Sequence, residues 1–486
     1  MKHKLNETSE SETRSFLTKL FGFSLSSYIG AIITFVATFI NTRLYDTATT
    51  GKINLFFTVQ SFILYLAYFG MDQSYCRYYY ECREENERSV LLGLCVSIST
   101  YVTLVLSISI FFLWKPISEY IAGETRIGII IALAISVYAQ LLWRYLSLYQ
   151  RMKLQILLYT LLMVLNSITN KLSFTSVAWI SRDYQICFFA IALSSLLVTV
   201  LFYFIQKERI IVYTPSKIIR FQYTKKLLRF GVPLMPIALI SWLNSSIPIL
   251  VLRKFESYDV VGVYSSTVIL TTIINLIQSG FNTFWVPYYY ENYKSNQRRI
   301  QRIHDLITFA VTVFAVLIIM FKPILYLMVG ESYRAGAIAF SLLLLSPICY
   351  TIGETTGIGI MISEKSYLNS IVYSLGAAAN LFFSFFLVPK YGVVGAGLAV
   401  ALSSVITLLI KSLLGEKYYV SILNPIKTCF AVFGLLTVAF FDAFLPAEYE
   451  AYRYIIIPVL MAGLFYIYRK ESLFILTRIK NEFYTR

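Results

Sequence analysis

The chain is a succession of long apolar segments separated by short polar ones. Hydrophobic residues make up 57% of its 486 residues, and charged residues only 14%. A helix needs roughly 20 apolar residues to cross the hydrocarbon core of a bilayer. Fourteen segments meet this requirement, centred near residues 30, 62, 101, 137, 165, 194, 240, 273, 312, 345, 376, 402, 432 and 461. Because backbone groups in lipid must be satisfied within the protein, these segments predict an all-α polytopic membrane protein with about 14 transmembrane helices.

The basic residues fall mostly on one side of this predicted topology. An even number of spans places both termini on the same side, and 30 of the 42 Lys and Arg residues lie on that side. Loops rich in Lys and Arg stay in the cytoplasm, so we expect both termini there. The net charge of +16 therefore follows from membrane topology and indicates no nucleic-acid partner.

A polar stripe runs along the predicted span 265–291. Thr271, Asn275, Gln278 and Asn282 follow one another at spacings of four, three and four, which places them on one face of a helix. A membrane span with such a face should turn it toward a bundle interior or a water-filled cavity. The alternative is that these side chains only join two helices by hydrogen bonds.

A repeat of 210 residues relates this stripe to an earlier one. The earlier stripe consists of Ser61, Tyr65, Tyr68 and Asp72. A tyrosine cluster ending in glutamate follows each stripe, at 78–81 and at 288–291. Six spans per half give both halves the same orientation, so the repeat is parallel, about an axis along the membrane normal. Internal repeats with polar residues near the membrane midplane are typical of secondary transporters.

The repeat divides the chain into four predicted parts. Residues 1–206 form an N-terminal six-helix bundle, and residues 227–414 form a C-terminal six-helix bundle. Between them, residues 207–226 form a basic cytoplasmic linker, which should lie against anionic lipid headgroups. Residues 415–486 hold two additional helices and a cytoplasmic tail.

The sequence shows none of the features that would indicate an enzyme. No connecting segment exceeds about twenty residues, which leaves no room for a soluble catalytic domain, and no G-x-x-x-x-G-K-[ST] phosphate loop occurs. The six cysteines have no metal-ligand spacing, and we expect reduced thiols that pack in or near the spans. The only histidines are His3 and His304, so we expect no metal site.

Four stretches of the chain carry a family resemblance. They are FGMDQSYCRYYYE (69–81), FGVPLMPIALISWLN (230–244), VVGVYS (260–265) and LVPKYGVVGAGLAVALSS (387–404). In this order and spacing they resemble the polysaccharide flippases of the multidrug/oligosaccharidyl-lipid/polysaccharide exporter superfamily, and the similarity extends from about residue 14 to about residue 470. The resemblance implies two pseudo-symmetric six-helix bundles that face each other in a V. Spans one, two, seven and eight would line a central cavity, and two extra spans would follow.

The resemblance also implies a transport function. Such a protein exports an oligosaccharide carried on a polyprenyl pyrophosphate to the outer leaflet by alternating access, for surface polysaccharides such as lipopolysaccharide O-antigen. It would lie in the bacterial cytoplasmic (inner) membrane, with membrane lipid and other polysaccharide-assembly membrane proteins as its partners. The chain departs from many relatives late in span seven, where Ile247 and Pro248 replace an Asp-Arg pair. Any role of that pair therefore does not carry over to this chain.

The polar faces of the four lining spans supply the candidate substrate-cavity residues. They are Ser27, Thr34, Thr38, Asn41, Ser61, Tyr65, Tyr68, Asp72, Ser241, Asn244, Thr271, Asn275, Gln278 and Asn282. Lys and Arg side chains on these spans could attract the pyrophosphate. The candidates are Lys19, Arg43, Lys52, Arg77, Arg253 and Lys254. The alternative is that each of these cations anchors a helix at the membrane interface.

Asp72 is a carboxylate within one of these faces, and its repeat counterpart is the neutral Asn282. It could bind a coupling proton or sodium ion, and we expect no other cofactor. The alternative is a salt bridge with Arg77 at the end of the helix.

Three other functions stay open at this point. A cation-coupled drug antiporter shares the superfamily fold, but we would expect more buried acid on its lining spans. A peptidoglycan-precursor flippase shares both fold and chemistry, but it usually has more cavity arginine than this sequence offers. A membrane polysaccharide polymerase, which is an enzyme, would be expected to carry a large outer loop, and no such loop occurs here.

Overall fold

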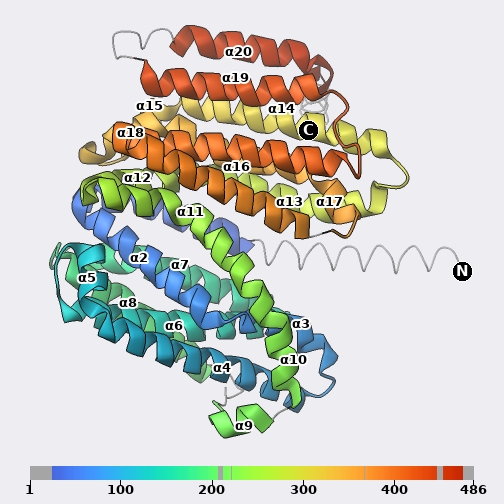
Figure 1. Cartoon of the computed structure of the whole chain (residues 1–486). Helices are drawn as coiled ribbons and strands as arrows, with labels where there is room; N and C mark the ends of the chain where they lie inside the picture. The colour runs from blue at the N-terminus through green and yellow to red at the C-terminus, as the bar shows by residue number, and fades with distance from the viewer. Residues whose placement is uncertain (1–24, 206–211, 221, 366, 446–452, 474–486) are drawn as a thin grey trace, which may run out of the picture. The chain divides into compact units, whose positions relative to one another are not determined.

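The computed structural model describes residues 25–205, 212–220, 222–365, 367–445 and 453–473, and every regular element within these ranges is a helix (Figure 1). The predicted all-α fold is therefore confirmed. The chain forms two compact units, Met1–Leu243 and Asn244–Arg486, which we call unit 1 and unit 2. The division falls inside one helix, α11, rather than in the basic linker between the predicted bundles.

Unit 1 is built around the helix α6. The described helices of this unit are Leu25–Leu44, α2 (Thr47–Tyr68), α3 (Met71–Tyr78), η1 (Tyr79–Glu81), α4 (Glu85–Phe112), α5 (Trp114–Ala122), α6 (Ile127–Met152), α7 (Ile156–Val177), α8 (Tyr184–Ile205), α9 (Pro215–Arg220), α10 (Gln222–Gly231), η2 (Val232–Leu234) and the start of α11 (Met235–Phe255). α6 contacts α2, α3, α4, α5, α7 and α8. Gln140 on α6 donates to Asn166 Oδ1 at 3.0 Å and to Ser195 Oγ at 3.3 Å. Such interhelical hydrogen bonds hold helices together where lipid supplies no hydrophobic driving force.

Unit 2 is built in the same way around α16. Beyond the end of α11, its described helices are α12 (Tyr258–Thr271), α13 (Ile273–Asn292), α14 (Gln297–Met320), α15 (Lys322–Met328), η3 (Glu331–Gly336), α16 (Ala337–Thr356), α17 (Ile358–Ile362), α18 (Tyr367–Glu416), α19 (Pro425–Phe444) and α20 (Arg453–Ile467). α16 contacts α12, α13, α14, α18 and α19. A Cβ on Gly359 would lie 2.0 Å from the carbonyl oxygen of Gly415, so glycine lets α17 approach α18 at backbone distance.

α18 joins two predicted spans into one long element. It contains 50 residues, and at 1.5 Å per residue it would extend about 75 Å if straight, far more than the roughly 30 Å hydrocarbon core. A break at Gly392, with φ 52° and ψ −123°, divides it inside the predicted turn VPKYGVVG. Glycine adopts this backbone conformation without the steric cost that a side chain would add.

The predicted count of fourteen spans is not confirmed. Within the described residues, eleven helices are long and apolar enough to cross a membrane, or up to twelve if the bent pair α2–α3 is one span. α18 accounts for two of the predicted spans, and the 15-residue α20 is shorter than a typical membrane span.

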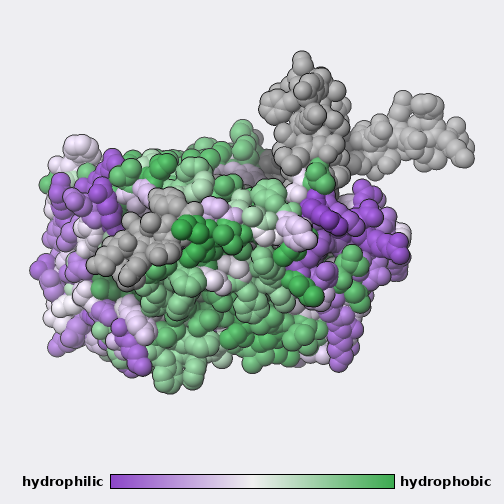
Figure 2. Space-filling model, turned by 90° about the horizontal axis from the view of Figure 1, so that it is seen from above, coloured by the Kyte–Doolittle hydropathy of each residue, from purple (hydrophilic) through white to green (hydrophobic). Residues whose placement is uncertain are grey.

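The outer surface of unit 2 has the character of a lipid-facing wall. Figure 2 shows the face that carries α19 and α20, with hydrophobic residues over a broad middle zone and hydrophilic residues at both ends. Large apolar side chains on these helices are exposed, including Phe433, Ile455, Val459 and Tyr466. An exposed apolar surface of this extent matches the hydrocarbon core of a bilayer rather than water.

Candidate functional site

Unit 1 contains a pocket of about 440 Å³. Its lining residues come from α2, α3, α6, η2 and α11, and they are Ser61, Leu64, Tyr65, Tyr68, Gly70, Asp72, Gln73, Trp143, Arg144, Leu234, Met235 and Ala238. The predicted stripe Ser61, Tyr65, Tyr68 and Asp72 thus lines a single pocket. The volume falls within the range of roughly 300–1,000 Å³ that is typical of ligand sites.

An ion pair forms the charged part of the unit 1 pocket. Arg144 Nη2 lies 2.9 Å from Asp72 Oδ2, and Gln73 Nε2 donates to the same oxygen at 3.0 Å. The Arg144 side chain is 35% exposed, whereas that of Asp72 is only 8% exposed. The guanidinium lies 5.9 Å from the ring centroid of Tyr68, and its buried Nε has no hydrogen-bond partner. Since a guanidinium carries five N–H donors, Arg144 has donors left for an anion in the pocket.

A break between α2 and α3 positions Asp72. The predicted continuous span instead ends at Tyr68, bends by 51° and resumes at Met71. Phe69 and Gly70 both have positive φ, at 49° and 71°. A Cβ on Gly70 would lie 2.0 Å from the carbonyl oxygen of Gly231, so the bend depends on two glycine backbones in contact. The bend turns Asp72 toward α6, which explains why its partner is Arg144.

The predicted alternative pairing of Asp72 with Arg77 is wrong. Arg77 makes an exposed ion pair with Glu81 at 2.8 Å, one helical turn further along. Because α3 begins a new helix after the bend, Asp72 lies in its first turn and Arg77 in its last.

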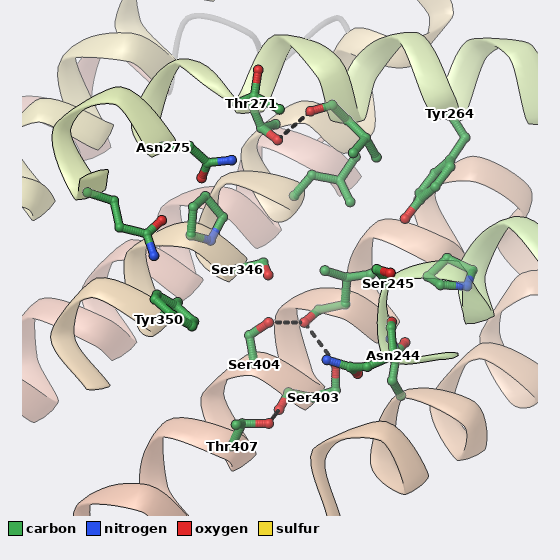
Figure 3. A pocket seen from close by; sticks show the side chains of 18 residues that line it. Asn244, Ser245, Tyr264, Thr271, Asn275, Ser346, Tyr350, Ser403, Ser404 and Thr407 are labelled. Carbon is green, nitrogen blue, oxygen red and sulfur yellow. Dashed lines mark hydrogen bonds between the residues drawn. The ribbon is translucent and has the colours of Figure 1, made fainter. Parts of the chain in front are cut away.

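Unit 2 contains a second pocket, of about 380 Å³, with different chemistry (Figure 3). Thirteen of its eighteen lining residues carry a hydroxyl or an amide, and none carries a charge. The thirteen are Asn244, Ser245, Tyr264, Thr271, Thr272, Asn275, Gln278, Ser346, Tyr350, Asn380, Ser403, Ser404 and Thr407. The remaining five are Pro248, Val268, Leu343, Pro347 and Val400.

An ion pair lies beside this pocket and outside its lining. A smaller cavity of about 70 Å³ shares Asn244, Tyr350 and Thr407 with the pocket and reaches Lys411. Lys411 Nζ lies 2.7 Å from Glu354 Oε1, and the lysine side chain is only 9% exposed. The lysine runs along a glycine groove, since a Cβ on Gly357 would lie 2.4 Å from Lys411 Cε.

The predicted cavity residues of spans seven and eight divide between two environments. Asn244, Thr271, Asn275 and Gln278 line the unit 2 pocket. Ser241 and Asn282 do not belong to its lining, and Asn282 Oδ1 is buried without a hydrogen-bond partner. The predicted continuous span 265–291 is interrupted between α12 and α13, at Thr272.

The predicted face of span one, Ser27, Thr34, Thr38 and Asn41, lines neither pocket. Thr34 and Thr38 donate to carbonyl oxygens of their own helix, at Gly30 and Thr34. Asn41 is buried against α7, where it donates to the Lys171 carbonyl at 3.0 Å and accepts from Thr175 at 2.6 Å. In Asn41 the polar group therefore joins two helices, which was the alternative interpretation of such stripes.

None of the predicted pyrophosphate-binding cations within the described residues lines either pocket. Lys52 lies over the Tyr184 ring at 4.1 Å, and Arg253 donates to the Tyr258 hydroxyl at 2.7 Å. Lys254 lies between the rings of Phe255 and Phe385. Arg43 is exposed and Arg77 pairs with Glu81, while Lys19 lies outside the described residues.

Sequence reasoning missed Arg144, Glu354 and Lys411. Arg144 has the local pattern of an interfacial cation at the inner end of its span, and its partner Asp72 lies 72 residues away. One signal was present: the repeat offset of 210 pairs Arg144 of α6 with Glu354 of α16. Both halves carry a charged side chain at this position. This indicates a role other than anchoring a helix at the membrane interface.

The described residues also contain thiols and candidate metal-ligating side chains. All six cysteines are free, and burial raises the pKa of the Cys82 thiol, which lies between η1 and α4. The part of the chain that the structure describes contains no group of three or more His, Cys, Asp or Glu side chains that could hold a metal ion.

The chain is similar to curated proteins of polysaccharide synthesis. It is 23% identical over 191 residues to the capsular polysaccharide biosynthesis protein CapF of Staphylococcus aureus, covering 38% of this chain and 48% of that protein. It is 26% identical over 223 residues to the Lsg locus putative protein 1 of Haemophilus influenzae, covering 43% of this chain and 54% of that protein. The chain thus spans about half the length of the curated relatives it matches.

Solved structures show the same fold. The lipid II flippase MurJ in its inward closed conformation aligns with a TM-score of 0.69 at 14% identity, covering 94% of this chain and 99% of that one. An inward-facing multidrug resistance MATE family transporter aligns with a TM-score of 0.54 at 17% identity, covering 80% and 94%. At this level of identity the likeness concerns the fold alone.

A family comparison identifies the chain. The sequence profile described as "Polysaccharide biosynthesis protein" matches residues 16–293, which is more than half of the chain. Together with the curated relatives and the shared fold, this match confirms the resemblance to the polysaccharide flippases of the multidrug/oligosaccharidyl-lipid/polysaccharide exporter superfamily. The chain belongs to the polysaccharide biosynthesis protein family.

Proposed function

We propose that this protein moves a polyprenyl-pyrophosphate-linked oligosaccharide across the bacterial cytoplasmic membrane by alternating access, for the synthesis of a surface polysaccharide. Lipopolysaccharide O-antigen is one such product. The family and its curated relatives support the pathway, and the fold shared with known transporters supports transport rather than catalysis. We expect lipid-linked oligosaccharide, membrane lipid and other polysaccharide-assembly membrane proteins as partners.

The observation that carries this proposal is the partly exposed Arg144 in the unit 1 pocket. The transported molecule must take a pyrophosphate and a glycan through about 30 Å of hydrocarbon, where exposed charge is prohibitive. A guanidinium binds phosphate oxygens through two parallel hydrogen bonds, which a lysine cannot do. The buried Asp72 holds Arg144 in place through Nη2, and the partly exposed guanidinium has further N–H donors for a phosphate.

The alternatives have weaker support in the two pockets. A drug antiporter for cations would need a carboxylate that a bulky substrate can reach, but Asp72, the carboxylate in the unit 1 lining, is only 8% exposed and is covered by Arg144. The unit 2 lining contains no carboxylate. A peptidoglycan-precursor flippase would use the same phosphate chemistry, and the identity of the accumulated intermediate distinguishes it from our proposal.

The Asp72–Arg144 ion pair could also respond to a coupling ion. A proton or a sodium ion that binds Asp72 would neutralise the carboxylate and leave Arg144 without its partner, so the pocket would attract a phosphate more strongly. We propose Asp72 as the coupling site on this basis, with no further cofactor.

The proposal is tested in a strain from which the gene is deleted. We expect a lipid-linked oligosaccharide to accumulate on the cytoplasmic face, to be identified by mass spectrometry, and to disappear when the intact gene is returned. Accumulation of a peptidoglycan precursor instead, or of no lipid-linked saccharide, would refute the proposed substrate. Reporter fusions at residues 215 and 480 should be active in the cytoplasm, and a fusion at 120 on the outer side, if both termini are cytoplasmic.

A further inference from the structure

The unit 2 pocket is built from uncharged hydrogen-bonding groups (Figure 3). Some of them are satisfied by the protein. Asn380 Nδ2 donates to the Asn244 carbonyl at 3.0 Å and joins α18 to α11, and Thr407 donates to the Ser403 carbonyl of its own helix at 2.7 Å. These bonds use donors of Asn380 and Thr407, while the Thr407 oxygen can still accept a hydrogen bond from a ligand.

Other lining groups have no protein partner. Within the described residues, the side-chain amides of Asn275 and Gln278 and the hydroxyl of Ser346 make no hydrogen bond. Polar side chains that join helices bond across the interface, as Asn380 does. Groups left open in a pocket inside an apolar bundle must be matched by water or by a ligand, because an unmatched polar group is costly there.

An aromatic ring lies among these open groups. Tyr350 is 41% exposed and forms part of the wall near Ser346. A pyranose ring has one or two faces of C–H groups and a rim of hydroxyls. A pocket with an aromatic face and surrounding amides and hydroxyls satisfies both parts.

The nearest cation is not available to an anionic ligand. Lys411 lines the small adjoining cavity, where its Nζ lies 5.5 Å from the Tyr350 ring centroid, and it is 9% exposed and bound to Glu354 at 2.7 Å. In the unit 1 pocket, by contrast, Arg144 is 35% exposed, and its guanidinium has more N–H donors than Asp72 uses. The unit 2 pocket therefore offers little to a pyrophosphate and much to an uncharged polyol.

We infer that the unit 2 pocket is a subsite for the saccharide part of the transported molecule, and that it binds uncharged sugar residues through Asn275, Gln278 and the Tyr350 ring. This inference rests on the proposed function and deepens it, because it assigns the saccharide and the pyrophosphate to different pockets. Residues of this pocket would then determine which glycan is accepted.

The test measures the two ligand parts separately on the purified full-length protein in lipid nanodiscs. The first probe is the free oligosaccharide released by mild acid from the intermediate that accumulates in the deletion strain, observed by saturation-transfer NMR. The second probe is inorganic pyrophosphate, observed by phosphorus line broadening. For Asn275→Leu we expect at least a five-fold loss of saturation transfer with unchanged pyrophosphate binding, and for Arg144→Gln the reverse.

Matched variants separate binding from structural damage. Thr407→Val and Thr437→Val each remove a hydroxyl that bonds to its own helix, but only Thr407 lines the pocket. We expect weaker oligosaccharide binding for Thr407→Val alone. Asn275→Asp keeps a hydrogen-bonding group and should bind the saccharide within two-fold of the unaltered protein, whereas a phosphate in this pocket would be repelled.

Each outcome decides one question. Absence of oligosaccharide saturation transfer in the unaltered protein, or equal signals for it and a folded Asn275→Leu variant, overturns the subsite. Such a result leaves the proposed function standing if the deletion strain still accumulates lipid-linked oligosaccharide. If no such intermediate accumulates, the proposed function itself fails.

Discussion

The two units carry ion pairs that start from equivalent helices but are built differently. In unit 1 the α6 residue is the cation Arg144, which is 35% exposed beside a pocket. In unit 2 the α16 residue, 210 positions later, is the carboxylate Glu354, and its partner Lys411 is 9% exposed in a glycine groove. Equivalent positions in the two repeats can therefore serve different purposes. In unit 1 the ion pair is accessible from a pocket, whereas in unit 2 it joins two helices.

The helix that lines each pocket is broken, but the two breaks have different backbone conformations. In unit 1 the lining helix breaks at Phe69 and Gly70, both with positive φ and in contact with Gly231. In unit 2 the break lies at Thr272, whose φ of −65° and ψ of −11° any residue can adopt. The first break depends on glycine, whereas the second does not.

The largest effect is expected from Gly70→Ala. The new methyl group would overlap the Gly231 carbonyl and would require a positive φ, so unit 1 should lose its fold. The comparison variant is Thr272→Ala, which we expect to leave the melting temperature within about 2 °C. Both are measured by expression level and thermal unfolding of purified protein. Equal stability of the two variants would remove the proposed difference between the breaks.

The next effect concerns the closed ion pair. Lys411→Met should destabilise the protein by about 1–3 kcal/mol, because the half-buried Glu354 loses its charge partner. Glu354→Gln combined with Lys411→Met should recover most of that loss, and it should retain export. If the double variant is stable but exports nothing, then this pair serves transport and the contrast between the units is mistaken.

Arg144→Gln should weaken phosphate binding and strongly reduce export. Loss of a charge-assisted bond to phosphate, about 1.5–3 kcal/mol, should lower export roughly ten- to hundred-fold in the deletion strain. Arg151→Gln, two turns further on the same helix and outside the pocket, is the matched control and should export normally. Surface polysaccharide is quantified by immunoblotting, with protein levels compared. Near-normal export by Arg144→Gln would contradict its role as the phosphate-binding group.

The finest distinction concerns Asp72→Asn, which imitates Asn282 of the second repeat. Asparagine preserves shape and can still accept from Arg144, but it cannot bind a proton or a sodium ion. We expect a folded variant whose export falls at least ten-fold and no longer responds to collapse of the ion gradient by ionophores. Export at the normal rate would show that Asp72 only orients Arg144.

The sequence indicated which residues share a polar face, but it did not indicate where the helices that carry these faces bend. Ser61, Tyr65, Tyr68 and Asp72 line one pocket, because the first three lie within α2 and Asp72 follows directly after a short bend. The bend itself depends on contact between Gly70 and Gly231, which lie far apart in the sequence. No local sequence pattern near residue 70 predicts such a contact.

The charged groups were the least predictable part of the site. An arginine at the end of an apolar segment has the same local pattern whether it snorkels to the interface or pairs inside a bundle, and Arg144 does the latter. Likewise Asn41 satisfies helical spacing but bonds to α7 instead of lining a pocket. Periodicity fixes which face a residue occupies, whereas tertiary packing decides what that face meets.

The contact between Gly70 and Gly231 has a consequence for the order of assembly. It closes a separation of 161 residues, and Ser74 and Ser61 likewise bond to Leu227 and Trp242. At a translation rate of about 5–20 residues per second, roughly 8–30 s pass between synthesis of the two glycines. By the end of that interval the first six apolar helices have been synthesised, while the pocket of unit 1 still lacks the residues after 231 that line it. A nascent chain released before residue 243 would therefore carry an unfinished first unit.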